Sequence, residues 1–243
     1  MAAYSKDFIL TELFCDANGE VTMKGIVDLV FQLVANQEYD WPYEHKLRGY
    51  NWIVLSHHFA CQSRPRLGDK VRLETGIIEV NRFFVYRYYH FYNSDGQVVI
   101  KGQSQFSLMD LEARKIVRIP DQFQAENSGL KAERPYRFKK NLGEPDLSSE
   151  ARVQYTEIDA NQHVNNSVYL NWVINQVAGT FLASRAVQAF DISYDHELGL
   201  GQAYQLASRI EEQEDSAQTW HQVLSGETSC ARIHVDWLSR DGN

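Results

Sequence analysis

Three polar residues with complementary chemistry alternate in the second half of the chain. Asp159, Asn161 and His163 occupy every other position shortly before an apolar stretch that runs from Val168 to Trp172. In an extended or turning segment, alternate side chains project to one side, so this carboxylate, amide and imidazole can converge. Such a set can orient a reactant, hold a water molecule and transfer a proton. The helical pattern begins only after these residues, which predicts a site mounted at the start of a helix.

The elements that must position this set are predicted from hydrophobic periodicity. In the first half, residues 8–14 alternate like a strand, and apolar residues at helical spacing follow from Met23 to Val34. Segments rich in β-branched and aromatic residues then predict strands at 52–61, 70–80, 83–92, 97–108 and 115–118. A helix followed by an antiparallel meander is typical of an α+β unit in which the sheet curls around the helix.

The same order of elements returns after a polar passage. Apolar periodicity fades before residue 131, so we predict domains at 1–130 and 151–243, joined by a linker at 131–150. A strand is expected at residues 152–155, and a helix after the polar set is expected to continue to about Ala186. Further strands are predicted at 189–195, 203–211, 220–225 and 231–238.

The repetition is also visible in the residues themselves. Residues 16–21 align with residues 159–164 at an offset of 143 positions, and four of the six residues are identical. Residues 67–71 align with residues 200–204 at an offset of 133 positions, just before a predicted strand in both halves. Each copy of a duplicated sequence forms one supersecondary unit, so we predict an internal duplication.

The duplication separates scaffold from chemistry. Aspartate and asparagine near a helix start often cap it, and the first copy carries both, as Asp16 and Asn18. Capping therefore accounts for the shared pair. His163 stands where the first copy has Glu20, so the imidazole needs a further explanation and the chemistry is expected in the second copy.

Composition and charge exclude several classes of protein. The net charge of −8 argues against general nucleic-acid binding, which needs a basic field. Cys15, Cys61 and Cys230 are far apart, so neither a disulfide framework nor a zinc site is predicted, and reduced thiols in a cytoplasm are expected. No signal peptide is apparent, and the apolar stretch 26–35 is far short of the roughly 20 residues that cross a bilayer.

These residues carry a resemblance to a known family. A duplicated helix-then-meander unit, with Asp-x-Asn-x-His-Val-Asn-Asn at the second helix start and Tyr169 and Trp172 within that helix, resembles the bacterial type of acyl-acyl carrier protein (acyl-ACP) thioesterase. Trp52, residues 64–69 and residues 192–197 extend the resemblance over nearly the whole chain. It implies two tandem hotdog units, each a long helix wrapped by a curled sheet, with the substrate pocket in the first half and catalysis in the second.

The site residues of that family can be located one at a time. Asp159, Asn161 and His163 match its Asp-x-Asn-x-His triplet, and Glu197 matches its glutamate after the next strand. The chain departs from the plant members at Leu198, where they have a cysteine. A cysteinyl acyl-enzyme at that position is therefore impossible, and a water molecule or a carboxylate is the expected attacking group.

The resemblance implies hydrolysis of fatty acyl thioesters, above all acyl-ACP, with release of free fatty acid at the end of elongation. We expect Glu197 to act as general base, and the backbone N–H groups of Val164 and Asn165, at the helix start, to hold the oxyanion. Asp159 can orient His163, or it can attack the thioester to form a mixed anhydride. The sequence leaves both routes open.

The expected partner is an acyl carrier protein, without metal, cofactor, nucleic acid or membrane insertion. Carrier proteins of this kind are acidic, so docking on this acidic chain requires a local basic surface. The linker supplies the densest basic run, which consists of Arg134, Arg137, Lys139 and Lys140. Such a run can equally be a solvated surface that binds no partner. A covalent tandem can be a monomer or pair further into a homodimer.

Other functions of the same fold remain open. An acyl-CoA thioesterase uses the same residue types on another carrier. A hotdog dehydratase also uses an acid and a histidine, on 3-hydroxyacyl thioesters. A non-catalytic acyl-binding module would need neither the acid nor the histidine.

Overall fold

The computed structural model describes residues 3–40, 48–121 and 131–240. The chain forms two compact units, Met1–Pro135 and Tyr136–Asn243, and each is described by itself. The predicted domain boundary near residue 130 adjoins residues 122–130, which lie outside the described residues.

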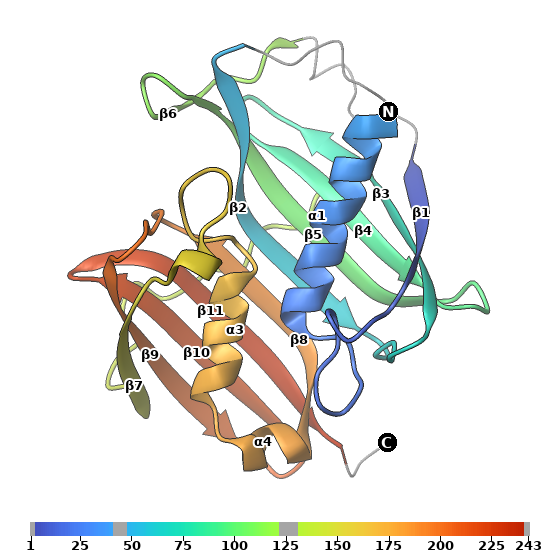
Figure 1. Cartoon of the computed structure of the whole chain (residues 1–243), viewed down its shortest axis with the longest axis vertical. Coiled ribbons are helices and arrows are strands. Elements are labelled where there is room, and N and C mark those ends of the chain that lie inside the picture. The colour runs from blue at the N-terminus through green and yellow to red at the C-terminus, as the bar shows by residue number, and fades with distance from the viewer. Residues whose placement is uncertain (1–2, 41–47, 122–130, 241–243) are drawn as a thin grey trace. The chain divides into compact units, whose positions relative to one another are not determined.

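The N-terminal unit wraps an antiparallel sheet around one long helix (Figure 1). The sheet order is β1-β3-β4-β5-β2, and β6 pairs with β5. Its elements are β1 (Tyr4–Ile9), α1 (Met23–Asp40), β2 (Tyr50–Cys61), β3 (Lys70–Val80), β4 (Val85–Tyr92), β5 (Val98–Asp110) and β6 (Lys115–Val117).

Burial explains why these residues form a helix and a sheet. The predicted apolar stripe of α1 is its covered face, with Ile26, Val27 and Val30 at most 2% exposed. On β4, buried and half-buried residues alternate, as expected for a strand with one face against a helix. The removal of this apolar surface from water holds helix and sheet together.

The C-terminal unit repeats the arrangement with a shorter helix (Figure 1). Its antiparallel sheet has the order β8-β11-β10-β9-β7. Its elements are β7 (Leu147–Arg152), the 3-10 turn η1 (Tyr155–Glu157), α3 (Val168–Gln176), α4 (Gly179–Ser184), β8 (Arg185–Tyr194), β9 (Ala203–Glu212), β10 (Ser216–Ser225) and β11 (Thr228–Ser239).

Several predicted boundaries are wrong, and three of these errors have a physical reason in the structure. The first strand is Tyr4–Ile9 rather than 8–14, because Phe14 N donates to Thr11 O in a turn. The strand expected at 152–155 lies at Leu147–Arg152 and overlaps the end of the predicted linker. It is an exposed edge strand and so lacks apolar alternation. The second helix ends at Gln176, because Val177 and Ala178 are extended, and β8 already begins at Arg185.

None of the described helices is both long enough and apolar enough to cross a lipid bilayer.

The loop that leads into α1 is closed by hydrogen bonds to one aspartate. Asp16 Oδ1 accepts from the N–H groups of Asn18, at 2.8 Å, and Glu20, at 3.1 Å. Glu20 is only 7% exposed, and its Oε2 accepts from Arg64 Nε at 2.8 Å. This ion pair ties the loop to the segment that follows β2, whose Pro65 carbonyl accepts from Val21 N at 3.0 Å.

The Glu20–Arg64 ion pair should therefore stabilise the N-terminal unit measurably. Replacing Arg64 by methionine leaves a shielded carboxylate without its closest cation, and we expect a loss of about 2–3 kcal/mol in the free energy of unfolding, measured by urea denaturation. Arg66→Met is the control, because Arg66 Nη1 lies 4.0 Å from Glu20 and its side chain is 63% exposed. Equal losses in both variants would show that the pair contributes nothing specific.

Candidate functional site

The residues from Ile158 to Ser167, here called the histidine loop, lead into α3 and form a tight turn around Asp159. Asp159 N donates to His163 O at 3.0 Å, and Gln162 N donates to Asp159 O at 3.0 Å. Asn161 donates to the Asp159 carboxylate twice, from its backbone N at 2.8 Å and from its side-chain Nδ2 at 3.4 Å. Gln162 has a φ of 68°, a left-handed conformation that closes the turn. The side chain of Asp159 thus holds the backbone in shape.

His163 lies between two carboxylates. Its Nδ1 is 3.8 Å from Asp159 Oδ1, and its Nε2 is 3.7 Å from Glu197 Oε1. These separations exceed hydrogen-bond length, so the imidazole is near both acids without being locked to either. The side chains of His163 and Asp159 are 21% exposed and that of Glu197 is 40% exposed. The structure thus brings together the aspartate, histidine and glutamate predicted from the sequence, and water can reach them.

The prediction that the backbone N–H groups of Val164 and Asn165 hold the oxyanion is wrong. Val164 N donates to Leu198 O at 2.8 Å, and Asn165 N donates to Glu157 O at 2.9 Å, so neither N–H group is free. The physical reason is that α3 begins only at Val168, so these residues belong to the histidine loop and not to a helix start.

Glu157 contacts α3 beside the histidine loop and was not among the residues predicted for the site. Its Oε1 accepts from Trp172 Nε1 at 2.7 Å, and its Oε2 accepts from Gln154 N at 2.7 Å. The Trp172 ring in turn stacks on Tyr204, with ring centroids 4.0 Å apart. Glu157 therefore fixes α3 against the start of the histidine loop. The spacing of Gln154 and Glu157, which is that of a capping box, was the available signal.

Burial favours the neutral form of Tyr169 and of the three cysteine thiols. Burial, with Cys230 and Glu197 nearby, raises the pKa of Tyr169 in the first turn of α3. Burial also raises the pKa of the Cys230 and Cys15 thiols, and it raises that of Cys61 to about 12. A nucleophilic thiolate is therefore disfavoured at all three cysteines.

The N-terminal unit contains the same frame with different side chains. Its Asp16 turn repeats the hydrogen bonds of the Asp159 turn, including the 2.8 Å and 3.4 Å bonds from the following asparagine. Glu20 occupies the position of His163, and Arg64 occupies that of Glu197 at the offset of 133 positions. A hydrogen-bonded ion pair thus stands where the C-terminal unit has an imidazole beside a carboxylate.

The basic residues predicted in the linker are exposed. Arg134 belongs to the N-terminal unit, whereas Arg137, Lys139 and Lys140 belong to the C-terminal unit. Among the latter, Arg137 and Lys139 line a cavity of about 200 Å³ on the C-terminal unit, together with Trp220.

Aromatic residues hold this basic segment against the sheet. Tyr136 stacks on His234 of β11, with ring centroids 4.5 Å apart, and its hydroxyl accepts from Trp220 Nε1 at 3.1 Å. The part of the predicted linker around Tyr136 is therefore packed on β10 and β11.

No cluster of metal-ligating side chains is present among residues 3–40, 48–121 and 131–240.

Solved structures with this fold span the whole chain. A 12:0-ACP thioesterase from Umbellularia californica aligns with a TM-score of 0.87 at 18% identity, covering 98% of this chain and 94% of that one. An acyl-ACP thioesterase from Bacteroides thetaiotaomicron aligns with a TM-score of 0.81 at 18% identity, covering 97% of both chains. The predicted α+β fold of two tandem hotdog units is thus confirmed.

Curated relatives are longer than this chain. A chloroplastic dodecanoyl-[acyl-carrier-protein] hydrolase of Umbellularia californica is 26% identical over 168 residues, which are 63% of this chain and 43% of the relative. A chloroplastic palmitoyl-acyl carrier protein thioesterase of Gossypium hirsutum is 22% identical over 196 residues, 75% of this chain and 46% of the relative. The chain therefore spans less than half the length of these relatives.

Models of the family match both halves of the chain. The acyl-ACP thioesterase N-terminal domain matches residues 2–127, and the acyl-ACP thioesterase C-terminal domain matches residues 141–239. With both domains matched in order over most of its length, the chain belongs to the acyl-ACP thioesterase family.

Proposed function

We propose that this protein hydrolyses fatty acyl thioesters carried by an acyl carrier protein, releasing free fatty acid and ending elongation. The observation that carries the proposal is the position of His163, with Asp159 and Glu197 each within 4 Å of one ring nitrogen. This arrangement lies in a chain whose two halves match the two domains of the family. The reaction is proposed for the cytoplasm, where the thiols of the chain stay reduced.

In the proposed mechanism Glu197 is the general base. Its carboxylate is the most exposed of the three groups, so it can take a proton from a water molecule as that water attacks the thioester carbonyl. The carbon–sulfur bond then breaks. The proton passes from Glu197 to the nearby Nε2 of His163 and on to the departing thiolate, so the products are a carboxylic acid and a thiol.

Asp159 and Asn161 support this chemistry from the histidine loop. The two oxygens of Asp159 already accept hydrogen bonds from Asn161, and Asp16 makes the same bonds in the unit that has no histidine at this place. These contacts favour Asp159 as an orienting residue over Asp159 as a nucleophile. Asn161 retains amide N–H capacity, and we assign it as a donor to the oxyanion in place of the occupied N–H groups of Val164 and Asn165.

We propose that the carrier protein docks on the basic segment at Arg137, Lys139 and Lys140. These side chains are exposed, and the aromatic contacts of Tyr136 hold the segment in place on the sheet. A fixed cationic surface on an otherwise acidic protein can orient an acidic partner.

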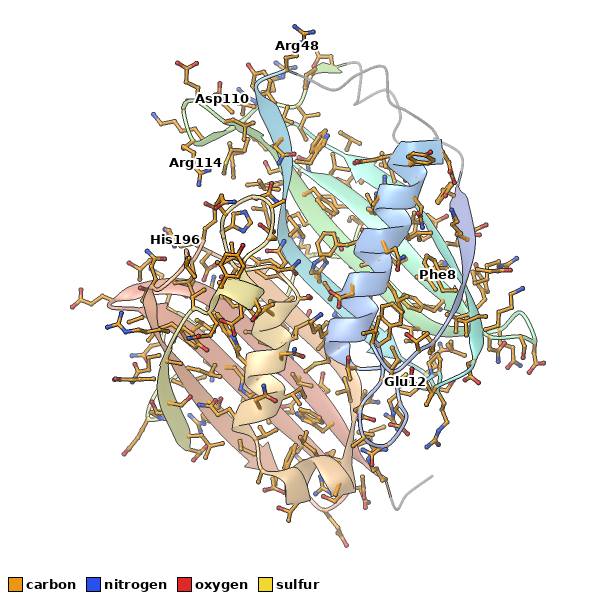
Figure 2. The ribbon with its side chains drawn as sticks, in the orientation of Figure 1. Phe8, Glu12, Arg48, Asp110, Arg114 and His196 are labelled. Atoms are coloured by element: carbon orange, nitrogen blue, oxygen red, sulfur yellow. The ribbon has the colours of Figure 1, made fainter. Side chains whose placement is uncertain are left out.

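Removal of any of the three central groups should abolish most turnover. We expect Asp159→Asn, His163→Ala and Glu197→Gln to fold normally and to lower kcat for acyl-ACP by at least about a hundredfold. Glu12→Gln is the matched control for the carboxylate changes, because Glu12 is an exposed carboxylate of the N-terminal unit (Figure 2). Retention of full activity in Glu197→Gln would refute the base assignment. A trapped acyl adduct on Asp159 would establish the anhydride route instead.

Charge reversal on the basic segment should weaken carrier recognition alone. We expect the triple change of Arg137, Lys139 and Lys140 to glutamate to raise KM for acyl-ACP about tenfold, with less effect at high salt. Turnover of a small acyl thioester should be unchanged, since that substrate makes no carrier contact. Lys115→Glu, an exposed reversal on β6, is the control. An unchanged KM for acyl-ACP in the triple variant would exclude this surface.

A further inference from the structure

The segment that carries Glu197, here called the glutamate turn (residues 195–199), is anchored on both sides of that residue. Downstream, Leu198 is 1% exposed and its carbonyl accepts from Val164 N at 2.8 Å. Upstream, Asp195 N donates to Cys230 O at 2.8 Å, which extends the pairing of β8 with β11 by one step. Glu197 therefore spans a short gap between two fixed points.

The upstream anchor is strengthened by a side-chain ion pair. Arg232 of β11 binds the Asp195 carboxylate with both ends of its guanidinium, Nε to Oδ2 and Nη2 to Oδ1, each at 2.8 Å. Ser229 Oγ donates to the same carboxylate at 2.8 Å. The side chains of Arg232 and Asp195 are only 25% and 18% exposed, so the pair is less screened than one in open solvent.

The aromatic segment before β7 covers the other side of this arginine. Arg232 Cζ lies 5.4 Å from the centre of the Phe138 ring, close enough for a cation–π contact. The guanidinium thus binds Asp195 through two nitrogens and faces the Phe138 ring, so its position is fixed. Asp195 is in turn held two residues before Glu197.

The N-terminal unit builds the same backbone frame without this ion pair. Gln62 N donates to Val99 O at 2.8 Å and Ser63 N at 3.3 Å, just as Asp195 N and His196 N both donate to Cys230 O. The equivalent of Asp195 is thus Gln62, which has no carboxylate. The frame itself does not require the ion pair, which occurs in the unit where the turn carries a glutamate rather than Arg64.

We infer that Arg232 is a positioning residue for the reaction, acting through Asp195 to hold Glu197 opposite His163. This inference rests on the proposed function, and in particular on Glu197 as the base. A base displaced by about 1 Å can lose a large part of its effect, because proton transfer requires near-contact geometry. The ion pair limits such displacement from the upstream side of the turn.

The test compares substitutions at Arg232 with a matched change elsewhere on the same sheet. We expect Arg232→Met to lower kcat for a small acyl thioester about tenfold while KM changes less than about twofold, since the reacting geometry and not binding is affected. Arg232→Lys, which keeps the charge but not the two-point contact, should recover part of the rate. Arg209→Met is the control, because Arg209 pairs with Glu211 on β9, at 3.1 Å.

The same substitution, made in the Glu197→Gln variant, distinguishes a positioning role of Arg232 from a general effect on stability. In Glu197→Gln, the further change Arg232→Met should reduce the residual rate less than about twofold, because the residue it positions is already absent. An equal tenfold loss in both backgrounds, or an unchanged kcat in Arg232→Met, would overturn the inference. If Arg232→Met fails to fold, Asp195→Asn is measured in the same two backgrounds with the same expectations.

Failure of the proposed function gives a different result. In that case the unaltered protein hydrolyses no acyl thioester, or Glu197→Gln retains full activity. Either result appears before Arg232 is changed, and either overturns the positioning role together with the base assignment.

Discussion

One backbone hydrogen bond joins the two segments of the C-terminal unit that carry His163 and Glu197. Val164 N donates to Leu198 O, and the residues immediately before these two are His163 and Glu197. His163 and Glu197 are each one residue away from the bond, and His163 Nε2 lies 3.7 Å from Glu197 Oε1. The bond joins Val164, shortly before α3, to Leu198, shortly after β8. It therefore depends on the helix, the sheet and the histidine loop together.

The N-terminal unit has the same frame with a different pair of side chains. Val21 N donates to Pro65 O, and the preceding residues are Glu20 and Arg64. There the two side chains form a hydrogen-bonded ion pair at 2.8 Å. In the C-terminal unit the corresponding pair is longer and partly exposed, so water can reach both side chains.

Much of the fold could be predicted from periodicity, because most of the helices and strands have one face against the core. β3 was predicted with its observed bounds, and the start of α1 was predicted at Met23. Prediction failed where tertiary contacts override local pattern. The edge strand β7 has no buried face to reveal it, and the second helix stops at Gln176 although the apolar residues continue.

The sequence by itself determined the Asp159 turn and its copy at Asp16, because these depend on local hydrogen bonds between neighbouring residues. It also singled out His163, through the contrast with Glu20, whereas Glu197 was located only by its match to the family. Only the tertiary structure showed that the N–H groups of Val164 and Asn165 are occupied. It also showed that Arg232 binds the Asp195 carboxylate. These contacts join segments distant in the chain, and no local spacing records them.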